Sequence, residues 1–438
     1  MKALLRWFFE TLVRLYYPVI RLEGREHVPE RGPCLVVANH PNALLDPLVM
    51  RVALKRPVGF LGKSTLFKNP VSRLTMEAFG GIPVYRSRDA EKGEDTAGQN
   101  EKTFALCREA LGRKAWIALF PEGTSHSDPT MRPMKTGAAR IALSARKEHG
   151  TSLALVIVPV GLVYDQKSVF RSRALVVVGE PLRVEDFYVH SLTDERAAVQ
   201  SLTEKIRDAL DAVVLQADTR ELLEGVARVA SWTARVPDLK DDPAQQHRRA
   251  LALIRRYRQL QVDDPARVER VVGMAAQYMR ILQALGVTDP WAVEVGEVRV
   301  PHALAALATL VGLFPLALVG VVLGWVPYRL AGRVAGRVAS EEDELGTVKL
   351  LAGTLFVLVA WIAEVFAAGW YLGWEASFAV ALLAPVGGYC ALRFEEQWAI
   401  VREAARHLWL RVRHADVAYT VAERRRQLAI EVADALGE

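Results

Sequence analysis

The feature that most constrains this chain is a long stretch without charge in its last third. Residues 303–327 contain no charged side chain, and this exceeds the roughly 20 apolar residues that a helix needs to cross a bilayer core. Pro315, inside the stretch, is tolerated in a membrane helix. Two more apolar runs follow at 350–374, interrupted by Glu364, and at 376–392. The sequence therefore predicts a transmembrane region over residues 301–394.

Charge helps to orient this region and to narrow the class of partner. The net charge of +6 is compatible with binding nucleic acid, anionic lipid or an anionic small molecule. The apolar runs favour lipid, so we expect a membrane-lipid partner and no nucleic acid. Several arginines follow residue 392 and predict that the helical, basic tail over 395–438 is cytoplasmic. If the soluble domain is also cytoplasmic, the number of crossings is even and one apolar run is re-entrant; otherwise this orientation is wrong.

An amphipathic segment opens the chain. Apolar residues recur at helical spacing over residues 1–20, and Trp7, Tyr16 and Tyr17 add rings with one polar end. This pattern predicts a helix lying in the membrane interface. Charges interrupt the apolar run and no small-residue cleavage site follows, which argues against a signal peptide. The alternative is that the apolar face packs on the following domain.

Short apolar runs alternate with helical patterns after residue 20. Four runs have the length and composition of buried strands: 34–38, 116–120, 153–162 and 174–182. Helical patterns fill 102–111 and 134–147, and one long helix is expected from about 193 to 230. This alternation predicts an α/β layer domain over residues 21–232.

Residues 233–300 are expected to form a helical region between that domain and the membrane. A polar linker is predicted at 237–247, followed by two helices near 248–260 and 264–286. The three cysteines, Cys34, Cys107 and Cys390, are far apart and have no metal-binding spacing. We expect reduced, largely buried thiols and no metal site.

A histidine and an aspartate follow the first predicted strand, within ANHPNALLDP at 38–47. A neutral imidazole commonly removes a hydroxyl proton near neutral pH. A carboxylate on its other ring nitrogen would fix the tautomer. His40 and Asp46 are six positions apart and do not share a face of a regular helix, so they meet only if a turn near Pro41 folds the chain back. The alternative is a surface histidine and a helix-capping aspartate.

Two further blocks suit a ligand that carries hydroxyl and phosphate groups. FPEGTSH at 120–126 leaves a strand and turns at Gly123, where backbone and hydroxyl groups can approach a ligand. Glu122 can accept a hydrogen bond from a hydroxyl. GGIPVYR at 80–86 ends in Arg86, whose guanidinium group suits a phosphate.

The remaining candidates are less distinctive. Lys63 and Lys135 could add positive charge near these blocks, but each is also explained as a solvated surface cation. IVPVGL at 157–162 is expected to be a core strand whose proline lies near the site.

These four blocks, in this order, resemble the glycerolipid acyltransferase superfamily of lysophosphatidate and glycerol-3-phosphate acyltransferases. The family pattern is N-H-x-x-x-x-D, a motif ending in a phosphate-binding arginine, F-P-E-G-T-R/S and V-P-V. The resemblance covers residues 20 to about 215. It implies that His40 is the general base and Asp46 its partner. The substrate-binding residues that follow from it are Asn42, Lys63, Arg86, Glu122, Gly123, Thr124 and Ser125.

The resemblance implies an O-acyltransferase of phospholipid synthesis. The acyl donor would be a thioester of coenzyme A or acyl carrier protein, used as co-substrate without a metal or other cofactor. The acceptor would be glycerol-3-phosphate or 1-acyl-glycerol-3-phosphate, giving lysophosphatidic or phosphatidic acid. The domain would lie on the cytoplasmic face of the cell membrane.

One departure from the pattern bears on the acceptor. Five residues, not four, separate His40 from Asp46, which is similar to the subgroup that contains fungal glycerol-3-phosphate acyltransferases. Ser125 and His126 also follow that subgroup, where lysophosphatidate enzymes commonly have arginine in place of Ser125. The departure favours glycerol-3-phosphate without excluding lysophosphatidate. The remaining alternatives are acylation of another lysophospholipid and a non-catalytic, lipid-binding membrane protein with the same fold.

Overall fold

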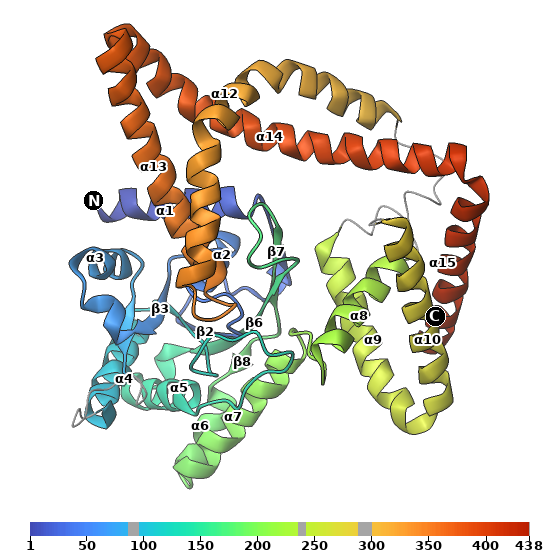
Figure 1. The fold of residues 1–438 in the computed structure, drawn as a ribbon. Helices are drawn as coiled ribbons and strands as arrows, with labels where there is room; N and C mark the ends of the chain where they lie inside the picture. The colour runs from blue at the N-terminus through green and yellow to red at the C-terminus, as the bar shows by residue number, and fades with distance from the viewer. Residues whose placement is uncertain (86–95, 235–241, 288–299, 438) are drawn as a thin grey trace. The chain divides into compact units, whose positions relative to one another are not determined.

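The computed structural model describes residues 1–85, 96–234, 242–287 and 300–437 (Figure 1). The chain forms two compact units. The first contains Met1–Leu223 together with the short segment Glu341–Thr347, and the second contains Glu224–Ser340 and Val348–Glu438. The first unit therefore includes a piece of chain from within the apolar, carboxy-terminal part of the sequence.

One sheet of eight strands lies at the centre of the first unit, and its order is β1-β7-β6-β2-β5-β3-β4, with β8 paired to β6. The strands are β1 Val19–Glu23, β2 Cys34–Ala38, β3 Val58–Lys63, β4 Ile82–Val84, β5 Trp116–Leu119, β6 Val156–Tyr164, β7 Arg173–Val178 and β8 Leu182–Arg183. β2 pairs in parallel with β5 on one side and with β6 on the other. All residues of β2 and β5 are buried, as expected for parallel strands that are covered on both faces.

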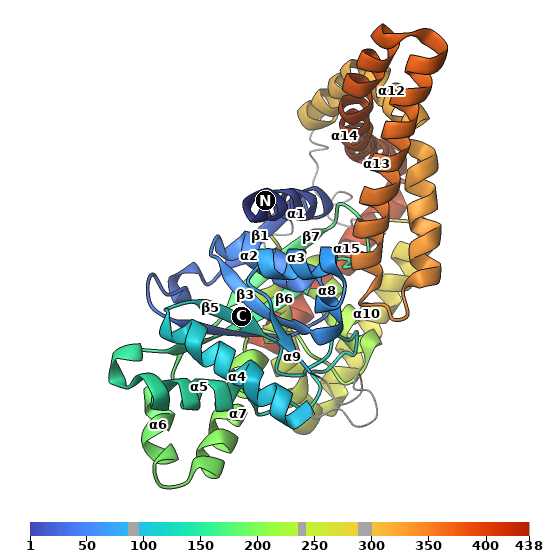
Figure 2. The same cartoon turned by 90° about the vertical axis from the view of Figure 1, so that its left-hand side faces the viewer.

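Helices cover both faces of this sheet (Figure 2). On one face α2 packs on β1 and β7, and α1 packs on α2 and α3; on the other, α5 packs on β2 and α7 packs on β2 and β6. The helices are α1 Lys2–Tyr16, α2 Leu45–Leu54, α3 Pro70–Ala78, α4 Thr96–Gly112, α5 Gly137–His149, α6 Glu185–Ser191, α7 Glu195–Asp211 and α8 Arg220–Trp232, with short 3₁₀ turns η1 Arg25–His27, η2 Ser64–Phe67 and η4 Thr151–Leu153. The predicted α/β layer fold is confirmed.

The edge of the sheet that matters for function is the carboxyl edge. β2, β5, β3 and β4 are successive parallel neighbours. In such a sheet the loops that follow the strands gather at one edge, which is where α/β proteins bind ligands. Sequence blocks that lie far apart along the chain are therefore brought to one place.

Several predicted elements are confirmed and others needed correction. The strands at 34–38 and 116–120 are β2 and β5, while the run at 174–182 is divided between β7 and β8. The single helix predicted from 193 to 230 was wrong, because α7 ends at Asp211 and a new helix, α8, begins at Arg220. The Thr219 hydroxyl accepts a hydrogen bond from the Leu222 N–H at 3.1 Å and caps this second helix.

The amino-terminal helix α1 has two kinds of surface. Val13 and Tyr16 are buried, and Arg6 donates a hydrogen bond to the Ala78 carbonyl oxygen at 3.1 Å, so part of the helix packs on the domain. Leu4 and Trp7 are 66% and 63% exposed. Contact between this exposed strip and a membrane interface remains a prediction.

The second unit contains a small helical bundle. Trp232 and Tyr278 share a buried core with Val421 and Leu428, which come from the far end of the chain. The helices of this unit after α8 are α9 Pro243–Asp263, α10 Pro265–Leu285, α12 Val300–Val338, α13 Leu345–Leu372, α14 Trp374–Arg413 and α15 Ala415–Leu436. α9 begins inside the linker predicted at 237–247, because the Asp242 side chain caps it at the Ala244 N–H. Residues 237–241 of that linker lie outside the described residues.

Three helices of the described chain are long and apolar enough to cross a membrane. Their candidate spans are Ala303–Val338, Leu345–Leu372 and Trp374–Arg406. The third extends well beyond the predicted run at 376–392. Little of their surface is buried within the protein, and apolar surface of this extent is expected to contact lipid rather than water.

Candidate functional site

The site is built on two neighbouring strands, β2 and β5, and on the loops that follow them. The loop after β2 carries His40 and leads into α2, and the loop after β5 carries FPEGTSH. The two loops are joined directly, because the His126 N–H donates a hydrogen bond to the His40 carbonyl oxygen at 3.1 Å. The two sequence blocks that contain His40 and Glu122 therefore form one local structure.

The chain between His40 and Asp46 folds back in a tight turn. Leu45 N–H donates to the Asn42 carbonyl oxygen at 3.0 Å, and Ala43 adopts a left-handed conformation with φ 42°. Asp46 then lies in the first turn of α2, where the helix dipole favours a negative charge. This geometry brings the Asp46 Oδ2 atom to 2.8 Å from His40 Nδ1. The turn that the spacing of the two residues required is present, and the alternative of a separate surface histidine and capping aspartate is not what the structure shows.

Asp46 is completely buried and its carboxylate is fully supported. Oδ2 accepts hydrogen bonds from His40 Nδ1 and, at 2.7 Å, from the Asn42 N–H. Oδ1 accepts a hydrogen bond from the Tyr164 hydroxyl at 2.6 Å. Burial, together with the adjacent Asp46 charge, holds the pKa of Tyr164 well above its ordinary value, so this phenol stays a donor. A buried carboxylate needs such donors, because an uncompensated charge would be costly.

The contacts of His40 define its tautomer. The Asp46 carboxylate can only accept, so Nδ1 carries the hydrogen and Nε2 of the neutral ring is left as an acceptor. The imidazole ring stacks on the Phe120 ring with centroids 3.7 Å apart and planes inclined by 5°. The ring is thus fixed by a hydrogen bond on one side and by an aromatic face on the other. A group held in this way can accept a proton at Nε2.

Asn39 fixes the start of the same loop. Its side-chain amide donates to the Leu162 carbonyl oxygen at 3.1 Å, and its side-chain oxygen accepts from the Leu162 N–H at 2.7 Å. These bonds continue the pairing of β2 with β6 one residue beyond the end of the β2 strand. The loop that carries His40 therefore leaves the sheet from a defined point.

The loop after β5 turns at Gly123, which has φ 76°. The Gly123 N–H donates to the Phe120 carbonyl oxygen at 2.9 Å. A side chain at position 123 would come within 2.6 Å of Lys135 Nζ, so glycine leaves room for that ammonium group. Lys135 is held here through its own N–H, which donates to the Pro121 carbonyl oxygen at 2.8 Å.

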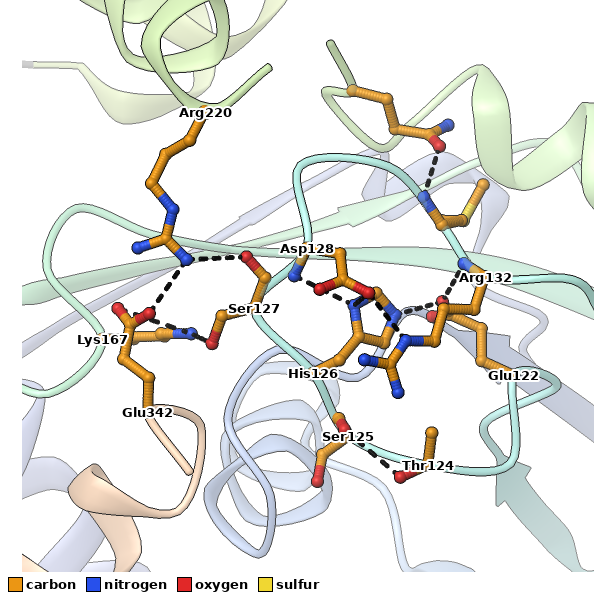
Figure 3. Close-up of polar contacts among 12 residues, drawn as sticks. Glu122, Thr124, Ser125, His126, Ser127, Asp128, Arg132, Lys167, Arg220 and Glu342 are labelled. Carbon is orange, nitrogen blue, oxygen red and sulfur yellow. Dashed lines mark hydrogen bonds and ion pairs between the residues drawn. The ribbon is translucent and has the colours of Figure 1, made fainter. Parts of the chain in front are cut away.

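Glu122 is 4% exposed and only half of its carboxylate is satisfied (Figure 3). Oε2 accepts from the Arg132 N–H at 2.7 Å and from His126 Nε2. The other ring nitrogen, Nδ1 of His126, accepts from the Asp128 N–H at 3.1 Å. Among the described residues, Oε1 of Glu122 has no hydrogen-bond partner. A buried acceptor without a partner suits a ligand that donates a hydrogen bond.

The other predicted site residues occupy different positions. Asn42 is completely buried, and its side-chain amide donates to the Tyr17 hydroxyl at 2.7 Å and to the Lys167 carbonyl oxygen at 3.3 Å. Those contacts support the Asp46 turn, and contact of Asn42 with substrate remains a prediction. Lys63 ends β3 on the same edge of the sheet as the site. Arg86 lies outside the described residues.

Thr124 and Ser125 follow Gly123 in the loop and are partly exposed. The Thr124 hydroxyl donates to the Ser125 carbonyl oxygen at 3.3 Å. Their roles as substrate contacts remain predictions. Among the described residues, no cluster of three or more histidine, cysteine or acidic side chains is arranged to hold a metal ion.

Sequence reasoning did not identify Tyr164, His126 or Tyr17 as parts of the site. Tyr164 is the last residue of β6, the parallel neighbour of β2, and a polar ring at the carboxyl end of a core strand could have signalled it. His126 was visible in the FPEGTSH block, but its contact with Glu122 depends on the shape of the loop. Tyr17 reaches Asn42 from the amino-terminal segment, and the sequence carries no signal for that contact.

A family model described as Acyltransferase matches residues 19–163, the stretch from β1 to the penultimate residue of β6. This match confirms the resemblance drawn from the four sequence blocks. The matched stretch contains His40, Asp46 and the whole FPEGTSH loop.

The chain is similar to proteins of yeasts and of humans. An uncharacterized acyltransferase of Schizosaccharomyces pombe is 25% identical over 99% of this chain and 80% of its own length. Glycerol-3-phosphate O-acyltransferase 2 of Saccharomyces cerevisiae is 35% identical over 30% of this chain and 18% of its own length. Human 1-acyl-sn-glycerol-3-phosphate acyltransferase beta is 31% identical over 33% of this chain and 49% of its own length. The similarity to these two enzymes thus spans less than half of each.

A solved structure also shows similarity. The 1-acyl-sn-glycerophosphate acyltransferase PlsC of Thermotoga maritima aligns with a TM-score of 0.34 and 18% identity, over 47% of this chain and 78% of its own.

Tyr164→Phe is predicted to lower the free energy of unfolding by about 1–3 kcal/mol, because it leaves one oxygen of a buried carboxylate without a donor. The measurement is thermal or denaturant unfolding of the full chain in detergent. Tyr188→Phe is the matched control, since it keeps the ring on which Arg146 stacks. Equal stability of the two variants would show that the hydroxyl of Tyr164 does not support Asp46.

Proposed function

Because residues 19–163 form an acyltransferase domain of the glycerolipid acyltransferase superfamily, we propose that this chain moves a fatty acyl group from a thioester to a glycerol-phosphate hydroxyl. The acceptor is glycerol-3-phosphate or 1-acyl-glycerol-3-phosphate. The observation that carries the proposal is the His40–Asp46 pair, which leaves His40 Nε2 ready to accept a proton.

The reaction follows from this geometry in two steps. His40 Nε2 takes the proton of the acceptor hydroxyl while the oxygen attacks the thioester carbonyl carbon, and Asp46 stabilises the imidazolium that forms. The tetrahedral intermediate then expels the thiolate, which takes the proton back from His40. A C–O bond has formed, a C–S bond has broken, and the histidine returns to its neutral state. No covalent enzyme intermediate is needed.

The loop after β5 is the proposed binding site for the glycerol part of the acceptor. Glu122 Oε1 is the buried acceptor that a glycerol hydroxyl would satisfy. Lys135 places a positive charge over the Gly123 turn, where it can attract the acceptor phosphate. The Gly123 N–H is already donated to Phe120, so the oxyanion of the intermediate needs a different donor.

Two features bear on the choice of acceptor. The five-residue spacing of His40 and Asp46 and the Ser125-His126 pair favour glycerol-3-phosphate. The similar enzymes, however, include one named for each acceptor. The choice is best tested by measuring acyl transfer to each acceptor in parallel with the purified chain. Acyl-CoA and acyl-loaded carrier protein are used as separate donors.

We also propose that the membrane region crosses the bilayer an even number of times. α8 leads from the first unit into the second, and the described residues from 224 to 287 contain no candidate span. Glu341–Thr347, which follows α12, belongs to the first unit again. The ends of α12 therefore lie on one side of the membrane.

The other two long helices complete this topology. α15 follows α14 and shares a core with α8 and α10, so the chain returns to the same side a second time. α12 has 39 residues and contains Pro315 and Pro327. At 1.5 Å per residue it is roughly twice as long as a 30 Å bilayer core, and Figure 1 shows that it bends. In the proposed topology α12 enters and leaves on the cytoplasmic face, while α13 and α14 cross as a hairpin.

His40→Gln is predicted to lower kcat by about 10²–10⁴-fold, because the variant lacks the proton acceptor. Transfer of labelled acyl groups from acyl-CoA to glycerol-3-phosphate measures this. His190→Gln is the matched control, since His190 is exposed on α6. Activity of His40→Gln close to that of the control would exclude His40 as the base.

Arg86→Gln is predicted to raise the KM for glycerol-3-phosphate by roughly 10-fold to 100-fold, the effect of losing a hydrogen bond to a charged group, with a smaller change in the KM for the acyl donor. Steady-state kinetics with each substrate varied in turn separate the two. Arg113→Gln, an exposed site directly after the end of α4, is the control. An unchanged acceptor KM would remove Arg86 from the phosphate site.

The proposed topology predicts that cysteines at two exposed positions label from opposite faces of the membrane. Leu372→Cys lies at the end of α13 and Ile430→Cys lies on α15. The native cysteines are buried, so an impermeant maleimide should give little background. Glu341→Cys is expected to label from the same face of the membrane as Ile430→Cys. Labelling of Glu341→Cys or Ile430→Cys together with Leu372→Cys would rule out the arrangement.

A further inference from the structure

An acidic connection between two apolar helices lies against the proposed catalytic turn. The segment Glu341–Thr347 joins α12 to α13 and belongs to the compact unit formed by residues 1–223. Its sequence, EEDELGT, begins with four acidic residues. Asp343 is only 2% exposed, so the segment is packed at this residue, while the three glutamates are exposed.

Gly346 is the point of closest approach to the site. A methyl group at this position would lie 2.7 Å from Asn42 Oδ1, 3.0 Å from the Lys167 carbonyl oxygen and 3.1 Å from Leu45 Cδ1. The first of these distances is too short for any side chain without displacement of Asn42. The first turn of α13 therefore rests directly on the turn between His40 and Asp46, and glycine is what permits the contact.

Asn42 connects position 346 to Asp46. Its N–H donates to Asp46 Oδ2, the same oxygen that accepts from His40. Its side chain is held by the Tyr17 hydroxyl and by the Lys167 carbonyl oxygen, to which Tyr17 also donates at 2.5 Å. A side chain at position 346 that displaced Asn42 would thus disturb the hydrogen bond between Asp46 and His40, which orients the imidazole.

Charged groups attach the same segment to the second loop of the site (Figure 3). Glu342 lies 2.9 Å from the Arg220 guanidinium and 4.0 Å from Lys167 Nζ. Arg220 also donates to the Ser127 carbonyl oxygen at 3.0 Å, and Lys167 donates to the Ser127 hydroxyl. Ser127 directly follows the FPEGTSH block. The connection therefore lies directly against the first loop at Asn42 and is joined to the second loop through Arg220 and Lys167.

The ion pairs of Glu342 and the packing of Gly346 have different effects on stability and on the site. Glu342 and Arg220 are each about half exposed, and an exposed ion pair contributes roughly 0–1 kcal/mol. The pair therefore sets the position of the segment more than it stabilises the fold. Lys167 is more enclosed, and burial lowers its pKa despite the nearby acidic groups Glu342 and Asp343. The packing of Gly346 on Asn42 is the contact through which catalysis would be affected.

We propose that Gly346 is a positioning residue of the acyltransferase site, and that the connection between α12 and α13 is a structural part of that site. The inference rests on the proposed function, because it assigns the role of Gly346 through His40. The membrane region would then do more than anchor the domain, since it supplies the segment against which the catalytic turn is held.

The functional test compares two glycine-to-alanine variants of the full chain in membranes. Gly346→Ala adds a methyl group against Asn42, whereas Gly353→Ala, on the same helix, meets only Ala331 Cβ at the ordinary distance of 3.9 Å. Small displacements of a catalytic group lower the rate strongly. We expect kcat to fall on the order of tenfold for Gly346→Ala, with both KM values and the unfolding midpoint close to those of Gly353→Ala. Equal kcat values for the two variants would overturn the proposal.

A second measurement tests the placement without depending on activity or on the folding of a variant. A carbodiimide activates a carboxylate and allows a nearby lysine to form an amide, with loss of water. We expect an amide between Lys167 and Glu342 in the wild-type chain, detected by mass spectrometry, and its loss in Lys167→Arg. Absence of the cross-link in the wild type would contradict the placement. If the wild type forms the cross-link but transfers no acyl group, the proposed function fails and the positioning role fails with it, while the placement stands.

Discussion

The site depends on one buried carboxylate. Asp46 has no contact with water and is held by the His40 ring, the Asn42 backbone and the Tyr164 hydroxyl. Two of these donors come from the turn after β2 and the third comes from the end of β6, so the carboxylate can be buried only when the turn, the start of α2 and the end of β6 are all in place. Folding the domain and orienting the imidazole are therefore one event, and the acceptor nitrogen at Nε2 is its chemical result.

The loop after β5 carries a second buried carboxylate, whose hydrogen bonding differs from that of Asp46. Glu122 is also buried, but its Oε1 atom is left without a partner among the described residues. Asp46 is satisfied by the protein and serves the histidine, whereas Glu122 keeps one acceptor for a ligand. Two carboxylates at the same edge of the sheet thus have different proposed roles, which follow from their hydrogen-bond partners rather than from their charge.

Much of this was predictable from sequence, for physical reasons. The strands β2 and β5 are continuous apolar runs that end at polar loops, so their burial and the position of His40 and Glu122 at their ends could be predicted. The contact between His40 and Asp46 could be predicted only on the condition that the chain turns back between them. Tyr164, Tyr17 and Gly346 could not be found, because each reaches the site through tertiary contacts that leave no pattern in the local sequence. The break between α7 and α8 was missed because Thr219, which caps the second helix, lies in an otherwise helical pattern.

The proposed topology of the membrane region also depends on contacts that the sequence does not reveal. Apolar length alone gives three candidate spans, which would place the two ends of the region on opposite sides. The packing of α15 with α8 and α10 and the return of Glu341–Thr347 to the first unit favour an even number of crossings. The same return brings a segment of the membrane region to the proposed catalytic turn, which links the anchoring of the enzyme to its chemistry.

The central claim is that His40 acts as the base when an acyl group is transferred from a thioester to a hydroxyl of a glycerol phosphate. The most direct measurement is identification of the product by mass spectrometry, after the purified chain is given an isotope-labelled acyl thioester with glycerol-3-phosphate and 1-acyl-glycerol-3-phosphate together. The account predicts a labelled ester on one of these acceptors and release of free thiol in equal amount. Release of labelled free fatty acid alone, or no turnover of the thioester, would contradict it.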